Sequence, residues 1–194
     1  MIKSLFYSFT GWLFFCHLLM AQPHPKDIAL FPQENSNRSI SDLSGIWEFK
    51  KDPENIGIKN QWFNGLTETR SIAVPGSWNE QFTDSRDYLD AVWYQTEAFV
   101  PENWSDEEVW IRFGSVNYHA TVWVNGQQLG IHEGGHLPFA FDISKVTKTG
   151  EKNTIVVRVE NELKPSRVPT GDVPNGFFSN YPKPNFDFFP YLNS

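Results

Sequence analysis

Short segments in which apolar and polar residues alternate recur along the chain from residue 45 to residue 160. Glycine, proline, asparagine and aspartate separate these segments at intervals of roughly ten residues, the spacing of strands joined by short turns. An alternation of period two places every second side chain on one face of a strand. The segments are residues 45–50, 92–100, 109–113, 120–124, 127–131, 139–143 and 154–160. Because no stretch shows sustained helical periodicity, the sequence predicts an all-β protein built as a sandwich.

The clearest turn lies between residues 120–124 and 127–131, where Asn125 and Gly126 connect the two segments. An Asn-Gly pair is preferred in the type I′ turn of a two-residue hairpin, since both central residues need a positive φ. The sequence therefore predicts an antiparallel hairpin centred on these two residues.

Residues 132–136 read HEGGH and match the H-E-x-x-H motif of zinc proteases. In those enzymes an α-helix carries both histidines on one face, so that the imidazoles bind one Zn²⁺ and the glutamate acts as general base. Here both middle positions are glycine and Pro138 follows closely, and both features oppose a helix. We therefore expect His132 to Pro138 to be a loop between the strands of residues 127–131 and 139–143, with no metal site and no cofactor.

Size and charge limit the classes of function. The chain has 194 residues, of which 40% are hydrophobic and 16% aromatic. A chain of this size can bury the core of one domain. The formal net charge is −7 and no cluster of lysine and arginine occurs, which argues against a nucleic-acid partner and against an anionic membrane surface.

The amino terminus has the composition of a secretory signal. A short positive segment that contains Lys3 precedes an apolar segment, and the small residue Ala21 follows. We expect cleavage after Ala21, so that residues 1–21 form the signal peptide and residues 22–194 the mature chain. Cys16, the only cysteine, would leave with the signal, so no disulfide is expected. The protein is then secreted or periplasmic, or lysosomal in a eukaryote, with no membrane partner after cleavage; an uncleaved membrane anchor is the alternative.

Two groups of carboxylates are candidates for catalysis, but their surroundings favour solvated loops. They are Asp84, Asp87 and Asp90 in one polar segment and Asp106, Glu107 and Glu108 in another.

Several motifs occur in a fixed order along the chain. They read LSGIWEF, VPGSWNEQ, VWYQTEAFVP, HATVWVNGQQLGIHEGGHLPFAFDIS, VENELKPSRVPTG and NFDFFPY. In order and approximate spacing they resemble the amino-terminal sugar-binding domain of glycoside hydrolase family 2, most closely that of the β-glucuronidases, over nearly all of residues 30–191. The resemblance implies a jelly-roll, galactose-binding-like β-sandwich for residues 22–194. It also implies a glycoside substrate, a β-glucuronide, for the full-length parent and a parent that forms homo-oligomers.

Complete members of the family continue into an immunoglobulin-like domain and a (β/α)₈ barrel with two catalytic carboxyl groups. A retaining glycosidase needs these carboxyl groups about 5–5.5 Å apart. This sequence ends at Ser194, so the last strands of the sandwich, the barrel and both catalytic carboxyl groups are expected to be absent. No residue is therefore assigned a catalytic role, and the chain is expected to be inactive alone.

Asp187 is the one residue to which the resemblance gives a functional role. It lies in the aromatic motif NFDFFPY and matches an aspartate that, in related β-glucuronidases, reaches into the active site of the barrel and binds a sugar hydroxyl. A carboxylate can accept two sugar hydroxyls, and aromatic neighbours exclude water. The alternative is a turn carboxylate that accepts backbone N–H groups.

Tryptophan is also a candidate for sugar contact, but alternation within strands favours packing. The tryptophans for which we expect core or strand-face packing are Trp47, Trp93, Trp110 and Trp123. Those nearer to loops, whose roles the sequence leaves open, are Trp62, Trp78 and Trp104.

Three functions stay open at this point. The first is an amino-terminal piece of a β-glucuronidase-like hydrolase. The second is a free-standing carbohydrate-binding module on the same jelly roll, and the third is a non-catalytic interaction sandwich without a sugar role.

Overall fold

The computed structural model describes residues 32–162. Their strands are β1 (Gly45–Lys51), β2 (Arg70–Val74), β3 (Ala91–Val100), β4 (Trp110–Phe113), β5 (His119–Val124), β6 (Gln127–Glu133), β7 (Phe139–Asp142) and β8 (Glu151–Glu160). The helical elements are α1 (Trp78–Gln81) and the 3-10 helices η1 (Trp62–Asn64), η2 (Thr83–Ser85) and η3 (Glu102–Trp104). None of the described helices has the length and apolar character needed to cross a membrane.

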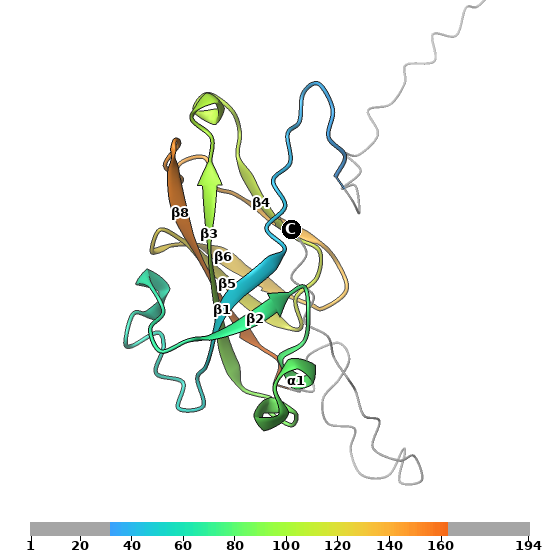
Figure 1. Ribbon diagram of the computed structural model, residues 1–194, viewed down its shortest axis with the longest axis vertical. Helices are drawn as coiled ribbons and strands as arrows, with labels where there is room; N and C mark the ends of the chain where they lie inside the picture. The colour runs from blue at the N-terminus through green and yellow to red at the C-terminus, as the bar shows by residue number, and fades with distance from the viewer. Residues whose placement is uncertain (1–31, 163–194) are drawn as a thin grey trace, which may run out of the picture. The chain divides into compact units, whose positions relative to one another are not determined.

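The described strands form two antiparallel sheets (Figure 1). One sheet has six strands in the order β2-β1-β3-β8-β5-β6, and the other consists of β4 and β7. In Figure 1, β3 and β8 run side by side through the larger sheet, with β1 and β2 beyond β3. The prediction of an all-β sandwich is confirmed. The expectation that the last strands are missing concerns residues outside the described part and stays a prediction.

The main core lies between the two sheets. Its buried side chains come from alternate positions of the strands and include Phe49, Tyr94, Val122 and Val157. Trp78, fully buried on α1, contacts this core, with its ring 6.3 Å from those of Phe49 and Tyr94. Burial of such side chains is the main favourable contribution to folding, at about 1.5–3 kcal/mol for each large apolar group.

A second, smaller core covers the opposite face of the larger sheet. Residues 52–66, here called the strap, place Trp62 and Phe63 over Trp93 and Trp123, at ring distances of 5.9 and 5.8 Å. Trp93 and Trp123 are themselves stacked at 5.3 Å. The central strands β3, β5 and β8 are therefore covered on both faces.

Asp52 fixes the start of the strap. Its buried carboxylate accepts hydrogen bonds from the backbone N–H groups of Ile56 and Gly57 and from the Trp93 indole, at 2.8, 2.9 and 2.9 Å. Gly57 is required here, since a Cβ at this position would lie 2.5 Å from the Trp93 ring. One carboxylate thus joins the turn of the strap to the sheet below it.

The predicted Asn125-Gly126 hairpin is confirmed. The two residues have φ of 50° and 78° and connect β5 to β6. The Asn125 side chain also donates to the Val146 carbonyl and to Asn153 Oδ1 and accepts from the Thr154 backbone, at 2.8, 2.8 and 3.0 Å. The turn is therefore bonded to β8 as well as to its own strands.

The structure differs from the sequence prediction in one missed strand, β2, and in strand limits, chiefly those of β6 and of β8, which begins at Glu151 instead of residue 154. β2 was absent from the predicted segments because only Ile72 and Val74 are buried in this short edge strand. β6 ends at Glu133 instead of residue 131, because His132 and Glu133 still pair with β5.

Tyr94 offers a test of the main core. Its hydroxyl is buried and has no hydrogen-bond partner within the described structure, and burial raises the pKa of this hydroxyl well above its ordinary value. An unpaired buried polar group costs about 1–3 kcal/mol. Tyr94→Phe removes that cost and is expected to raise the free energy of unfolding by about 1 kcal/mol or more, measured by denaturant titration.

Tyr88→Phe is the matched control. The Tyr88 hydroxyl donates to the Ala91 carbonyl at 2.8 Å, so its loss is expected to lower the free energy of unfolding by about 0.5–1.5 kcal/mol. Equal destabilisation by both substitutions would show that the Tyr94 hydroxyl has a partner in solution.

Candidate functional site

Asp187, predicted to contact sugar, lies outside the described residues, and its role stays a prediction. The described chain continues past the end of β8 to Glu162. The end of β8 is therefore the last described element before the segment that contains Asp187.

Three segments are hydrogen-bonded to one another at the end of β8. The backbone N–H of Tyr118 donates to the Glu160 carbonyl at 3.0 Å, and that of Gly134 donates to the Tyr118 carbonyl at 2.7 Å. The Ser115 hydroxyl donates to the Gly135 carbonyl. The HEGGH segment is thus joined, through the residues that precede β5, to the point where the chain leaves the sheet.

His132 and Glu133 are the last residues of β6, and the glycines form the turn that follows. The His132 ring stacks on Phe139 of β7, with centroids 3.9 Å apart and an interplanar angle of 12°. β6 extends beyond its predicted end because His132 pairs with Ala120, and Glu133 with His119, of β5. Burial lowers the pKa of His132, and the Gly134 carbonyl, 3.0 Å from Nε2, opposes that shift.

The predicted loop is confirmed for residues 134–138, whereas His132 and Glu133 belong to β6; none of these residues is helical. Gly134 has a φ of 119°, and a Cβ on Gly135 would lie 1.8 Å from Asn117 Oδ1, so the turn requires both glycines. Without a helix, His132 and His136 do not have the arrangement of a zinc protease. Within residues 32–162 no group of three or more histidines, cysteines or carboxylates is placed to hold a metal ion.

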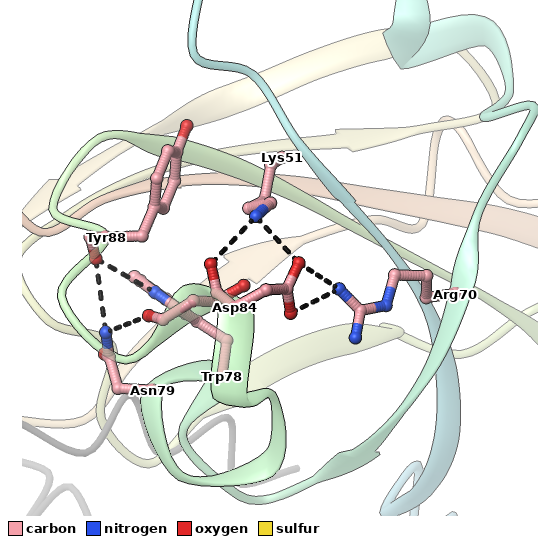
Figure 2. A network of polar contacts seen from close by, with 7 residues as sticks. Lys51, Arg70, Trp78, Asn79, Asp84 and Tyr88 are labelled. Atoms are coloured by element: carbon pink, nitrogen blue, oxygen red, sulfur yellow. Dashed lines mark hydrogen bonds and ion pairs between the residues drawn. The ribbon is translucent and has the colours of Figure 1, made fainter.

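Asp84 is the centre of the polar network shown in Figure 2. Its carboxylate lies 3.1 Å from Lys51 Nζ and accepts hydrogen bonds from Arg70 Nη1 at 2.9 Å. Both cations also lie over aromatic rings, Arg70 over Phe82 at 3.7 Å and Lys51 over Tyr88 at 5.5 Å. The hydrogen bonds from Arg70 and then Lys51 lower the pKa of Asp84 to about 2.

Trp78 and Asn79 complete this network on the side of α1 (Figure 2). The Trp78 indole and the Asn79 amide both donate to the Tyr88 carbonyl, at 3.2 Å each. Ser77 caps α1 by accepting from the Asn79 backbone N–H at 3.2 Å. The network therefore fixes the connection between β2 and β3, a structural role.

The sequence predicted the exposure of these carboxylates but not the ion pairs. The groups Asp84, Asp87 and Asp90 and Asp106, Glu107 and Glu108 are all exposed, as expected. The partners of Asp84 lie on β1 and β2, and they come together only when these strands pair. The signal that could have revealed the pairing was β2 itself, which was missed.

The tryptophans divide by the face of the strand that is covered. Packing is confirmed for Trp47, Trp93 and Trp123, whose side chains are at most 4% exposed. Core packing is excluded for Trp110, whose side chain is 55% exposed on β4, and strand-face packing, the other expectation for it, stays a prediction. Of those left open, Trp78 is fully buried, and Trp62 and Trp104 are partly buried against the two cores.

The ion pairs of Asp84 predict a dependence of stability on pH. Because the folded-state pKa of about 2 lies below the ordinary value of 3.8, the ionised carboxylate stabilises the fold above that ordinary value. This contribution is lost as the pH falls toward the folded-state pKa. Asp84→Asn is therefore expected to lower the melting temperature at neutral pH, and the difference from the wild type should disappear between about pH 4 and pH 2.

Asp87→Asn is the control for a change of net charge, since Asp87 is exposed in the same connection and no ion pair of the described residues includes it. Added salt should reduce the effect at Asp84, because the pair is solvent-accessible. A difference between Asp84→Asn and the wild type that persists at pH 2 would contradict the ion-pair explanation.

The fold and the ordered motifs define the class of protein. The sequence model described as "Glycosyl hydrolases family 2, sugar binding domain" matches residues 40–175. The chain belongs to this family, and the resemblance found in the motifs is confirmed.

Individual relatives are β-glucuronidases. That of Paenibacillus borealis is 40% identical over 147 residues, covering 74% of this chain and 25% of that protein. That of Sus scrofa is 37% identical over 185 residues, covering 84% of this chain and 28% of that protein. A solved β-glucuronidase from Ruminococcus gnavus superposes with a TM-score of 0.71 at 42% identity, over 73% of this chain and 24% of that one. The chain thus spans about a quarter of the length of these relatives.

Proposed function

We propose that this chain is the amino-terminal sugar-binding domain of a β-glucuronidase-like glycoside hydrolase, with no hydrolytic activity alone. The supporting observation is the family match over residues 40–175 together with 37–40% identity to about a quarter of two β-glucuronidases. The proposed substrate of the full-length protein is a β-glucuronide. A related structure from Ruminococcus gnavus, 43% identical with a TM-score of 0.67, is a complex with D-glucuronic acid.

Two of the described carboxyl groups lack the property of a glycosidase proton donor, which is a carboxylic acid with a raised pKa. The pKa of Asp84 is lowered by Arg70 and Lys51, and that of Asp142 by Ser144. We therefore assign a catalytic role to neither.

Export and assembly belong to the same proposal. Residues 1–21 are proposed to direct the protein to the periplasm, to the outside of the cell or, in a eukaryote, to the lysosome, and the parent is proposed to form homo-oligomers. Amino-terminal sequencing of the exported protein tests cleavage after Ala21, and an intact residue 1 would reject it.

The first activity test uses the purified chain and 4-nitrophenyl β-glucuronide. No turnover above that of a mock preparation is expected, because the acid and nucleophile pair of a retaining glycosidase is proposed to lie in the barrel of the full-length parent. A fusion of residues 22–191 to the remainder of the Paenibacillus borealis β-glucuronidase is the positive control and should hydrolyse the substrate. Turnover by the chain alone would contradict its inactivity, and an inactive but folded fusion would count against the proposed parent.

The second test concerns Asp187 in the same fusion. A hydrogen bond to a charged group contributes about 1.5–3 kcal/mol, so Asp187→Ala should lower kcat/KM by about one to two orders of magnitude. Asp187→Asn keeps one acceptor oxygen and should lose less.

The melting temperature separates this role from a structural one. If Asp187 only accepts backbone N–H groups in a turn, both substitutions should lower the melting temperature and leave kcat/KM close to that of the parent fusion. That result would withdraw the sugar contact.

A further inference from the structure

Asn-Gly pairs occur at two turns of the described chain, and their environments differ. Asn125-Gly126 connects β5 to β6, and Asn64-Gly65 ends η1 within the strap. Asparagine before glycine is prone to spontaneous deamidation, because glycine has no side chain that hinders attack by its backbone nitrogen on the preceding side-chain amide. The same reactive pair is therefore present in two settings.

Asn125 is held by hydrogen bonds to β8 and to the residues before it. Its backbone N–H donates to the Thr154 carbonyl at 2.8 Å, and its side-chain oxygen accepts from the Thr154 N–H at 3.0 Å. Its amide nitrogen, the group that deamidation would release, donates to the Val146 carbonyl and to Asn153 Oδ1 at 2.8 Å each. Rotation of the amide toward the Gly126 nitrogen would break all of these side-chain bonds.

The environment of Asn64 is looser. Both Asn64 and Gly65 are exposed, and the hydrogen bond of the Asn64 amide nitrogen goes to the exposed side chain of Gln61, at 3.3 Å. The attacking group, the Gly65 backbone N–H, donates to the Trp62 carbonyl at 3.1 Å. That bond closes a single 3-10 turn, and such short helices fray at their ends. Both bonds can therefore open without loss of a buried contact.

We propose that Asn64 is a site of spontaneous deamidation in the folded chain, whereas folding protects Asn125. The Gly65 nitrogen attacks the Asn64 amide carbon, so that a new C–N bond forms and the bond from this carbon to Nδ2 breaks. Nδ2 leaves as ammonia with the proton of the Gly65 N–H. Water then opens the cyclic imide at either carbonyl and yields aspartate or isoaspartate at position 64.

Isoaspartate at this position changes the strap. Its backbone runs through the side-chain methylene, so the chain between Phe63 and Leu66 becomes longer. Both of these residues are anchored, because Phe63 stacks on Trp123 at 5.8 Å and the buried Leu66 donates its N–H to Gln95 Oε1 at 2.7 Å. The added length lies between two fixed points and should loosen the strap over the larger sheet.

The test follows the purified full chain during incubation at mildly alkaline pH, in native buffer and in urea, by mass spectrometry of its peptides. The rate of each pair in urea is its own reference, which removes the effect of neighbouring residues. In native buffer Asn64 should react within a few-fold of its rate in urea. Asn125 should react at least about tenfold more slowly than in urea, because its turn must open first.

Hydrogen exchange of the incubated protein then tests the strap. Chains with isoaspartate at position 64 should exchange faster than fresh protein in residues 52–66, with unchanged exchange in β8. Asn64→Asp is the matched control, since it introduces the charge without lengthening the backbone, and its strap should exchange like that of the wild type. Asn64→Gln keeps the amide but requires a larger ring for the attack, so its strap should stay unmodified over the same time.

Several results would overturn the proposal. They are equal slowing of Asn64 and Asn125 in native buffer, which would mean that both react only after global unfolding; reaction of Asn125 in native buffer as fast as in urea; or absence of isoaspartate at position 64 in the folded chain once the unfolded chain has reacted there. Unchanged exchange of the strap in chains with isoaspartate would reject its loosening. The proposal is independent of the proposed hydrolase parent, because none of these measurements uses a sugar.

Discussion

Strands β3 and β8 form the pairing on which the rest of the described structure depends. Ten consecutive residues of each strand are in register, from Ala91 opposite Glu160 to Val100 opposite Glu151. β1 pairs with the free edge of β3, and β5 pairs with that of β8. Without this central pair, β1 and β5 would have no partner strand on that side. Both cores would also lose the side chains that β3 and β8 contribute to them.

The pair joins segments that are about sixty residues apart in the chain, and such non-local contacts are costly to form because they close a long loop. Local structure is coupled to them by side chains. Asn125 forms the hairpin turn and also bonds the start of β8, and Asp52 holds both the strap and Trp93 of β3. The turns are consequently stabilised by the same strands that they help to align.

The sequence was sufficient for the parts of the fold that depend on alternation and on turn chemistry. The Asn125-Gly126 hairpin and the glycine turn of HEGGH both need residues that tolerate a positive φ, and the sequence shows such residues directly. Alternation alone does not predict which face of a strand will be covered by another layer of the protein. Trp110 and Trp93 occupy similar alternating patterns, yet one is on the bare side of a two-stranded sheet and the other lies beneath the strap.

The candidate sites illustrate the same limit. The exposure of Asp84 could be predicted from its polar neighbours, but its ion pairs require β2, an edge strand with only two buried positions. Likewise, Asp142 lies opposite Trp110 only because of the register of β4 and β7, since it follows some thirty residues later in the chain. For Asp187 the sequence supplied a role, by resemblance to a family, but the residue lies outside the described part of the chain.

The two faces of the larger sheet are covered by different parts of the chain. Over its central strands one face is covered by β4 and β7 and the other by the strap, so the tryptophans there, Trp93 and Trp123, are consumed by packing. The outer face of the β4–β7 sheet has no such cover among the described residues, and its aromatic side chain stays accessible. An aromatic residue on a single-sided sheet can contact a ligand without any loss of core, whereas the same residue on β3 cannot be exposed without uncovering Val156 and breaking the indole bond to Asp52. Trp93 and Trp123 therefore serve packing, whereas the exposed Trp110 belongs to neither core.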